Sequence, residues 1–191
     1  MDGAEPHYTL FDTGPDSRSI IRNINALKIP VERIERVVLS HWHSDHSGGM
    51  LAFLRHRQAL APAAQTSTAC VVDVHPDRPI ARGIAPVSQR GHVIGRLPAD
   101  PTFAQIEECG GVVETHAQGH VVAGGTVWVS GEIPRVTHFE GGLPSGVRWR
   151  EHGSGESSGW VKEEVCVDAC MSPGTADDCS SGHYGREVRR D

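Results

Sequence analysis

The chain has 191 residues, of which 38% are hydrophobic and 22% are charged, and its formal net charge is −6. This length is enough for one domain with a hydrophobic core, and the composition is that of a soluble globular protein. Acidic and basic residues are interspersed, so no basic face indicates a nucleic-acid partner. No apolar run reaches the length needed to cross a membrane, so we expect no membrane partner.

The N-terminal segment and the cysteines favour a cytoplasmic protein. Residues 1–7 have neither a basic start nor an apolar core, so they do not read as a signal peptide. The five cysteines are an odd number and are spread unevenly. The expected location is therefore a reducing, cytoplasmic one.

The first part of the chain predicts a strand, a helix and a second strand. Tyr8 to Phe11 reads as a short strand that runs into a turn at residues 12–15. The helix is predicted by an apolar stripe at helical spacing, which consists of Ile20, Ile21, Ile24 and Leu27. Pro30 ends this helix, and the apolar run Val37 to Leu39 predicts the next strand. This order indicates an α/β fold, in which ligands gather at the ends of strands.

Three histidines and an aspartate follow the second strand within six residues. They form the pattern H-x-H-x-D-H and are His41, His43, Asp45 and His46. Imidazole nitrogens and carboxylate oxygens are ligands that zinc accepts. His41 and His43 are two positions apart and can face one ion, whereas Asp45 and His46 are adjacent and can bind a second ion nearby. Iron and manganese are also compatible with these ligands.

The middle of the chain predicts further helices and strands. Helices are expected over Met50–Leu60 and Pro101–Cys109, the first with Arg55, His56 and Arg57 facing outward. Strands are expected over apolar, β-branched runs, which are Cys70–Val74, Val112–Thr115 and Thr126–Ser130. Residues 81–98 are rich in loop formers, and His116, Gly119 and His120 mark a turn. This pattern indicates a layered α/β sandwich.

The C-terminal part of the chain changes in composition. From Gly141 onward it is rich in Gly, Ser and charged residues, with one strand-like segment from Trp160 to Asp168. The stretch from Ala169 to Asp191 has almost no apolar residues, so we expect a disordered tail. The predicted domain therefore covers residues 1–168 and the predicted tail covers residues 169–191.

The H-x-H-x-D-H motif after an apolar strand resembles the hallmark of the metallo-β-lactamase-fold hydrolases. Phe11-Asp12-Thr13-Gly14 resembles the upstream Asp-Thr-Gly turn of that superfamily. Val74-His75-Pro76-Asp77 and residues 130–140, which begin Ser-Gly-Glu-Ile-Pro-Arg, are similar to a narrower branch. That branch includes the archaeal-type dihydropterin ribofuranosyl-aminobenzene phosphate synthase-like proteins. The resemblance implies a partial metallo-β-lactamase-like αββα sandwich.

The resemblance also implies roles for individual residues. Asp12 would lie beside the metal centre and orient its ligands or water; the alternative is an ordinary turn former. Asp45 would be the catalytic residue that orients the nucleophile or accepts its proton. Arg135 would bind an anionic group of the substrate, and Glu132 and His75 would border the pocket. For Glu132 and Arg135 the alternative is an exposed ion pair on the surface. For His75 the alternative is an ordinary loop histidine.

The implied function is hydrolysis of an ester, lactone, amide or phosphoester in a small molecule, by hydroxide held on two zinc ions. A pterin-related synthase or transferase activity remains open. The superfamily supplies a third histidine ligand from a later strand, and this sequence has no recognisable equivalent. The first hairpin of the fold would also precede Tyr8. We therefore expect a fragment of such an enzyme, and the alternative is an inactive or weakly metal-binding chain.

Overall fold

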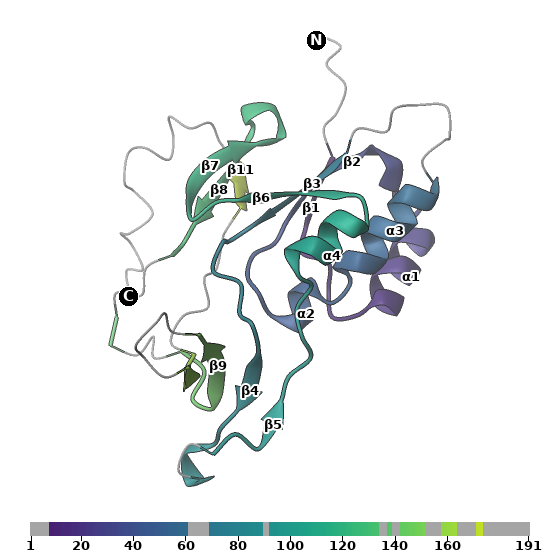
Figure 1. Cartoon of the computed structure of the whole chain (residues 1–191). Coiled ribbons are helices and arrows are strands. Elements are labelled where there is room, and N and C mark those ends of the chain that lie inside the picture. Colours follow the sequence, from purple (N-terminus) through teal and green to yellow (C-terminus); the bar gives the residue numbers. More distant parts are fainter. Residues whose placement is uncertain are drawn as a thin grey trace, which may run out of the picture.

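The computed structural model describes residues 8–60, 69–89, 92–133, 137–138, 142–151, 158–163 and 171–173. Its strands form three sheets, and helices lie beside one of them (Figure 1). The first sheet is parallel, with the strand order β1-β2-β3-β6. The other two are antiparallel, with the orders β10-β9-β4-β5 and β11-β8-β7.

The parallel sheet alternates strands with helices. Its strands are β1 (Tyr8–Phe11), β2 (Ile34–Val38), β3 (Cys70–Val74) and β6 (Gly111–Thr115). The helices are α1 (Ser17–Leu27), α2 (Ser44–Ser47), α3 (Met50–Leu60) and α4 (Phe103–Glu108), with a 3-10 turn, η1, at Val31–Arg33. Because the four strands run in one direction, their carboxyl ends meet at the same edge of the sheet. The expected α/β class is confirmed.

Helices α1, α3 and α4 cover one face of the parallel sheet (Figure 1). Helix α1 begins after Asp16, whose carboxylate accepts the amide hydrogens of Arg18 and Ser19. The core between the helices and the sheet consists of buried apolar side chains, including Ile24, Val37, Leu39, Met50, Phe53, Leu54, Val72, Val74 and Ile106. His56 and Arg57 were expected to face outward, but His56 is half-buried, and Arg57 is buried with its Nε donating to the carbonyl of Ile34.

A hairpin covers the other face of the parallel sheet. It consists of β7 (Gln118–Val122) and β8 (Val127–Gly131), joined by the 3-10 turn η3 (Ala123–Gly125). Val38 of β2 meets Val122 and Val129 in a second small core, whereas Val37 faces the helices, as expected from the alternation of side chains along a strand. His120 was expected in a turn, but it lies in β7 because its backbone pairs with that of Val129.

Three strands of the second sheet lie in regions without a strand pattern in the sequence, and the fourth, β10, overlaps the strand-like segment expected from Trp160. The strands of this sheet are β4 (Arg82–Ile84), β5 (Gly95–Arg96), β9 (Gly146–Arg150) and β10 (Gly159–Lys162), and a 3-10 turn, η2, covers Val87–Gln89. Local sequence does not reveal β4, β5 and β9, because this sheet is stabilised by cross-strand contacts such as the edge-to-face pair of Trp149 and Trp160, at 5.5 Å between ring centroids.

One short strand lies within the residues predicted as a tail. Met171–Pro173 form β11, which pairs antiparallel with β8, because the backbone of Val127 to Val129 offers a free edge there. The other residues of the predicted tail lie outside the described part of the chain. No helix within the described residues is both long enough and apolar enough to cross a membrane.

Candidate metal centre

The carboxyl ends of the four parallel strands carry the polar residues of the candidate site. Asp12 follows β1, Ser40 and His41 follow β2, His75 follows β3, and His116 follows β6. Parallel α/β sheets place their ligand sites at this edge. The shared edge therefore joins the H-x-H-x-D-H motif to His116, a residue that sequence analysis assigned only to a turn.

Trp42 anchors the loop between the first two histidines of the motif. Its side chain is buried, and its Nε1 donates to the carbonyl of His75 at 2.8 Å. Helix α2 begins directly after His43 and returns His46 toward His41. The ring centroid of His41 lies 4.6 Å from that of His43 and 4.1 Å from that of His46. The structure thus brings the three predicted imidazoles together.

The turn after β1 holds the ligand loop in place. Thr13 donates from both its amide and its hydroxyl to the carbonyl of His46, each at 2.8 Å. Gly48 and Gly49 permit this close approach, since a Cβ on Gly48 would collide with the carbonyl oxygen of Pro15 and one on Gly49 with that of Thr13. The glycine pair that follows the motif is therefore required by packing.

Asp12 contacts both the strand end and a predicted ligand. Its Oδ2 lies 2.7 Å from Nδ1 of His46 and accepts the hydroxyl hydrogen of Ser40 at 2.8 Å. Its Oδ1 accepts the amide hydrogen of Ser40 at 2.8 Å. A carboxylate beside Nδ1 holds the imidazole proton on that nitrogen, which leaves Nε2 as the atom that can bind a metal. Asp12 thus has the contacts of a carboxylate that orients a ligand.

Asp45 lies on the open side of the site, with 71% of its side chain exposed. Its Oδ2 is 3.5 Å from Nε2 of His46, which is too long for a hydrogen bond of ordinary strength. Two donor atoms bound to one tetrahedral zinc, each at roughly 2.1 Å, lie about 3.4 Å apart. The Asp45 and His46 donors are therefore spaced as two ligands of one ion.

A second group of donors lies around Asp73. This carboxylate is 3% exposed, and its oxygens lie 2.9 Å from Nδ1 of His116 and 2.8 Å from Nε2 of His120. Arg36 also donates to it, at 2.8 Å. Among the residues that the structure describes, these three are the set of ligand-type side chains whose donor atoms all lie within 4.8 Å of one another. Asp73, His116 and His120 are therefore a candidate metal-binding group.

Ser40 links the two groups. Its Oγ lies 3.1 Å from Nδ1 of His41 and 3.2 Å from Nδ1 of His46. Ser40 also lines a cavity of about 10 Å³ together with Asp73, His116 and His120. Such a cavity has room for roughly one water molecule or ion. The polar residues that follow β2 and those around Asp73 thus border one small space.

Two of the three residues predicted to contact substrate lie near this space. His75 lines the same cavity, and Glu132, which is exposed, is close enough for its charge to act on His75. Burial lowers the pKa of His75, while the carboxylates of Glu132 and Asp77 act in the opposite direction. Arg135, the predicted anion ligand, lies outside the described residues.

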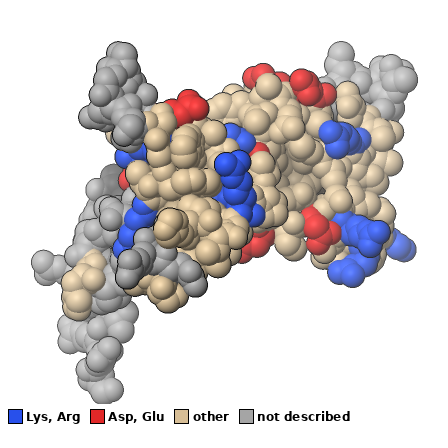
Figure 2. Space-filling view, turned by 60° about the horizontal axis from the view of Figure 1, so that its bottom comes forward, with Lys and Arg blue, Asp and Glu red and all other residues tan. Residues whose placement is uncertain are grey.

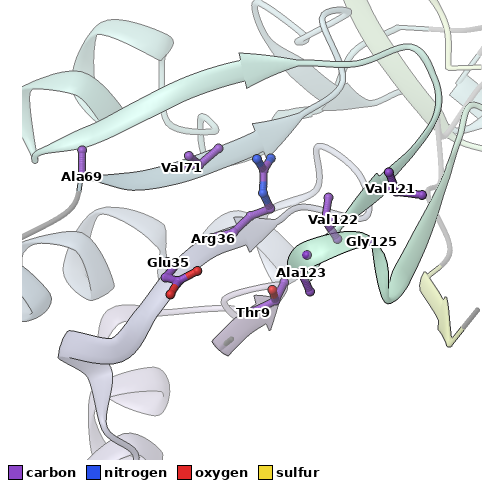
Figure 3. Close-up of a pocket in the computed structure, with 10 residues that line it drawn as sticks. Thr9, Glu35, Arg36, Ala69, Val71, Val121, Val122, Ala123 and Gly125 are labelled. Atoms are coloured by element: carbon purple, nitrogen blue, oxygen red, sulfur yellow. The ribbon is translucent and has the colours of Figure 1, made fainter. Parts of the chain in front are cut away.

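Two wider cavities contain none of the predicted ligands. One, of about 570 Å³, lies over β1, β2 and β3 beside η3, and Figure 3 shows Arg36 and Glu35 among its lining residues. The other, of about 700 Å³, is lined by apolar residues such as Val87 and Trp160, together with Lys162. The candidate metal centre is therefore not in either of the two larger openings.

The fold and the sequence identify the family. The model of the metallo-beta-lactamase superfamily matches residues 5–138, and the chain belongs to this superfamily. The crystal structure of Tm1679, a metal-dependent hydrolase of the beta-lactamase superfamily, is similar with a TM-score of 0.52 and 16% identity, over 90% of this chain and 56% of that one.

Two metallo-beta-lactamases are also similar, at lower TM-scores. Rm3 metallo-beta-lactamase has a TM-score of 0.40 and 19% identity, over 82% of this chain and 51% of that one. MEM-A1, a subclass B3 metallo-beta-lactamase from a soil metagenome library, has a TM-score of 0.41 and 16% identity, over 82% of this chain and 52% of that one. The chain thus spans about half the length of these solved structures. The search of curated proteins found no match.

Proposed function

We propose that this chain carries the metal-binding part of a metal-dependent hydrolase that uses two zinc ions. The observation that carries the proposal is the convergence of His41, His43 and His46, with Asp45 spaced from His46 as a second ligand of one ion. In this proposal His41 and His43 hold the first ion, while Asp45 and His46 hold the second. Superfamily membership supports the reaction class.

The donor set fits zinc. It consists of imidazoles whose rings lie side by side and a carboxylate, and the donor atoms of Asp45 and His46 are 3.5 Å apart, close to the spacing of two ligands on one tetrahedral ion. His116, at the same edge of the sheet, and His120, in β7, offer further imidazoles, and each contacts the Asp73 carboxylate. A histidine ligand oriented by a carboxylate is the usual arrangement around zinc. Iron and manganese accept the same ligand types.

The residues around the site have separable roles in the proposed reaction. A bound metal supplies Lewis acidity and lowers the pKa of a water ligand toward ~7. Asp12 fixes the tautomer of His46, and Trp42 fixes the loop that carries the histidines. Asp45, whose carboxylate is exposed on the open side, orients the attacking water and accepts its proton.

The proposed substrate is a small molecule with an ester, lactone, amide or phosphoester bond and an anionic group. Arg135 would bind that anion, and His75 and Glu132 would border it. On the face shown in Figure 2, Lys and Arg stand in small groups with Asp and Glu between them. This mixture supports a small substrate over a polyanion such as a nucleic acid, which requires an extended basic surface.

The proposal is tested by hydrolase assays on zinc-loaded protein with a panel of chromogenic esters, lactones, amides and phosphoesters. We expect His41→Ala and Asp45→Ala each to abolish the activity that the unmodified chain shows. His92→Ala is the matched control, because His92 is an exposed histidine outside the motif, and it should leave activity unchanged. Equal activity in all four proteins would remove the motif from the reaction, and no activity in any of them would favour the inactive alternative.

A further inference from the structure

Glu163 is a buried carboxylate directly after β10, in the second sheet. Its side chain is 3–4% exposed, and its amide donates to the carbonyl of Gly146 at 2.9 Å. Within the described residues its Oε2 is buried and has no hydrogen-bond partner. Burying a carboxylate without compensation is costly, so such a group needs a cation or a proton that satisfies it.

The side chain of Glu163 faces the H-x-H-x-D-H motif. Its Oε1 lies 3.6 Å from Nε2 of His43, a separation beyond the range of a hydrogen bond of ordinary strength. The same separation is close to the roughly 3.4 Å expected between two ligands of one tetrahedral zinc. Glu163 and His43 therefore stand in the same relation as Asp45 and His46, whose donors are 3.5 Å apart.

The second sheet is held against the ligand loop by a buried network. Ser47, at the end of α2, donates to Oδ1 of Asp100 at 2.7 Å, and Arg82 of β4 donates to Oδ2 of the same carboxylate, also at 2.7 Å. Strand β4 pairs with β9, and β9 pairs with β10. The position of Glu163 beside His43 is thus fixed by a chain of contacts that runs back to the motif itself.

We propose that Glu163 is a metal ligand, which binds one ion together with His43 and satisfies its own buried charge by doing so. The inference rests on the proposed metal site and adds to it a carboxylate from a different sheet. It gives the His41 and His43 pair an anionic partner, as Asp45 gives one to His46. The ion would be a divalent metal that accepts nitrogen and oxygen ligands, such as zinc or cobalt.

The test compares metal binding by the full chain with that of the isosteric variant Glu163→Gln. Zn²⁺ affinity is measured by competition with a chromophoric chelator, and the ligand field is monitored by the visible absorption of the Co²⁺ form. We expect Glu163→Gln to weaken Zn²⁺ binding by about 10-fold or more and to change the Co²⁺ spectrum, because an anionic ligand is lost. Glu108→Gln, an exposed glutamate of α4, is the control and should change neither.

The metal-free proteins supply a second readout. If Glu163 is a metal ligand, its charge is unsatisfied in the metal-free protein. Removing that charge in Glu163→Gln should then leave the melting temperature of the metal-free protein unchanged or raise it. If Glu163 instead forms a structural ion pair with protonated His43, Glu163→Gln lowers the melting temperature and leaves Zn²⁺ affinity unchanged. That second pattern would overturn the inference.

The remaining outcomes separate this inference from the proposed function. Zn²⁺ binding that is equal in the unmodified chain and in Glu163→Gln would overturn the role of Glu163 alone. A lack of Zn²⁺ binding by the unmodified chain would overturn both. If Glu163→Gln does not fold, Glu163→Asp is measured instead. This variant keeps the negative charge, but its side chain is shorter by one methylene, so its oxygens no longer reach the ion. Zn²⁺ affinity unchanged in Glu163→Asp would contradict a ligand role, and weaker binding would support it.

Discussion

Oδ2 of Asp12 lies 2.7 Å from Nδ1 of His46, although Asp12 belongs to the turn after β1 and His46 to the short helix α2. This contact determines which nitrogen of His46 faces outward to a metal. Asp12→Asn keeps the volume and tolerates the left-handed backbone at this position, where φ is 59°. An amide NH₂ opposite Nδ1 would move the imidazole proton to Nε2. We therefore expect Asp12→Asn to weaken Zn²⁺ binding about 10- to 100-fold, as measured by chelator competition.

The buried ion pair between Arg82 and Asp100 predicts a large loss of stability. Both side chains are at most 3% exposed, and Asp100 also accepts the hydroxyl hydrogen of Ser47. Asp100→Asn removes the charge and leaves the Arg82 guanidinium buried without a counter-ion. We expect urea unfolding to show a loss on the order of 3–5 kcal/mol. A change below about 1 kcal/mol would mean that water reaches Arg82 and that the network does not hold the second sheet in place.

Much of the first sheet was predictable because its elements have strong local signals. The segment Tyr8 to Phe11, the apolar stripe of α1 and the run Val37 to Leu39 predicted a strand, a helix and a strand, all of which are present. The end of β2 also predicted where His41, His43 and His46 gather. Periodicity and capping act over a few residues, so a single sequence contains them.

The second sheet and the Asp73 group were not predictable in the same way. Strand β4 has only three residues and pairs with β9 far along the chain, and such a pairing leaves no local pattern. Asp73 read as an ordinary strand residue, and His120 read as a turn residue. Two signals were nevertheless available: a charged residue inside the apolar run Val71 to Val74, and His116 directly after an apolar strand, as His41 follows β2. The role of Glu163 depends on a contact between sheets, and sequence patterns do not contain it.

The lowered pKa of His75 predicts a pH-dependent stability. Because burial lowers the pKa of folded His75, the unfolded chain takes up a proton at a higher pH than the folded protein does. The contribution of His75 to stability is therefore complete above about pH 6.5, the ordinary histidine value, and is lost as the pH falls below it. Urea unfolding of metal-free protein between about pH 8 and pH 5 should show this decline.

The matched variant for this pH effect is His75→Asn. Its amide oxygen can accept the Asp77 amide hydrogen, which Nδ1 of His75 accepts at 3.1 Å, but it does not titrate. We expect the pH dependence of stability to be shallower in His75→Asn than in the unmodified chain. Identical slopes in the two proteins would show that His75 keeps an ordinary pKa in the folded state.

The bidentate pair between Asp77 and Arg148 predicts a smaller loss of stability. Arg148 is 8% exposed and donates from both terminal nitrogens to Asp77, each at 2.7 Å, and this joins the loop after β3 to β9. The hydrogen bonds from Arg148 lower the pKa of Asp77. Since Asp77 is half exposed, we expect Asp77→Asn to cost only about 1–2 kcal/mol in urea unfolding at pH 7. An unchanged midpoint would show that solvent replaces Asp77 at Arg148.

The most direct measurement is the metal content of the purified chain, determined by elemental analysis for zinc, iron and manganese after dialysis without chelator. We predict about two metal ions per chain in the unmodified protein, and a clear loss in the double variant His41→Ala/His46→Ala. The control double variant His56→Ala/His92→Ala changes histidines outside the motif and should keep the metal. A metal-free unmodified chain, or equal metal content in the motif variant and the unmodified chain, would contradict a metal centre built on His41, His43 and His46.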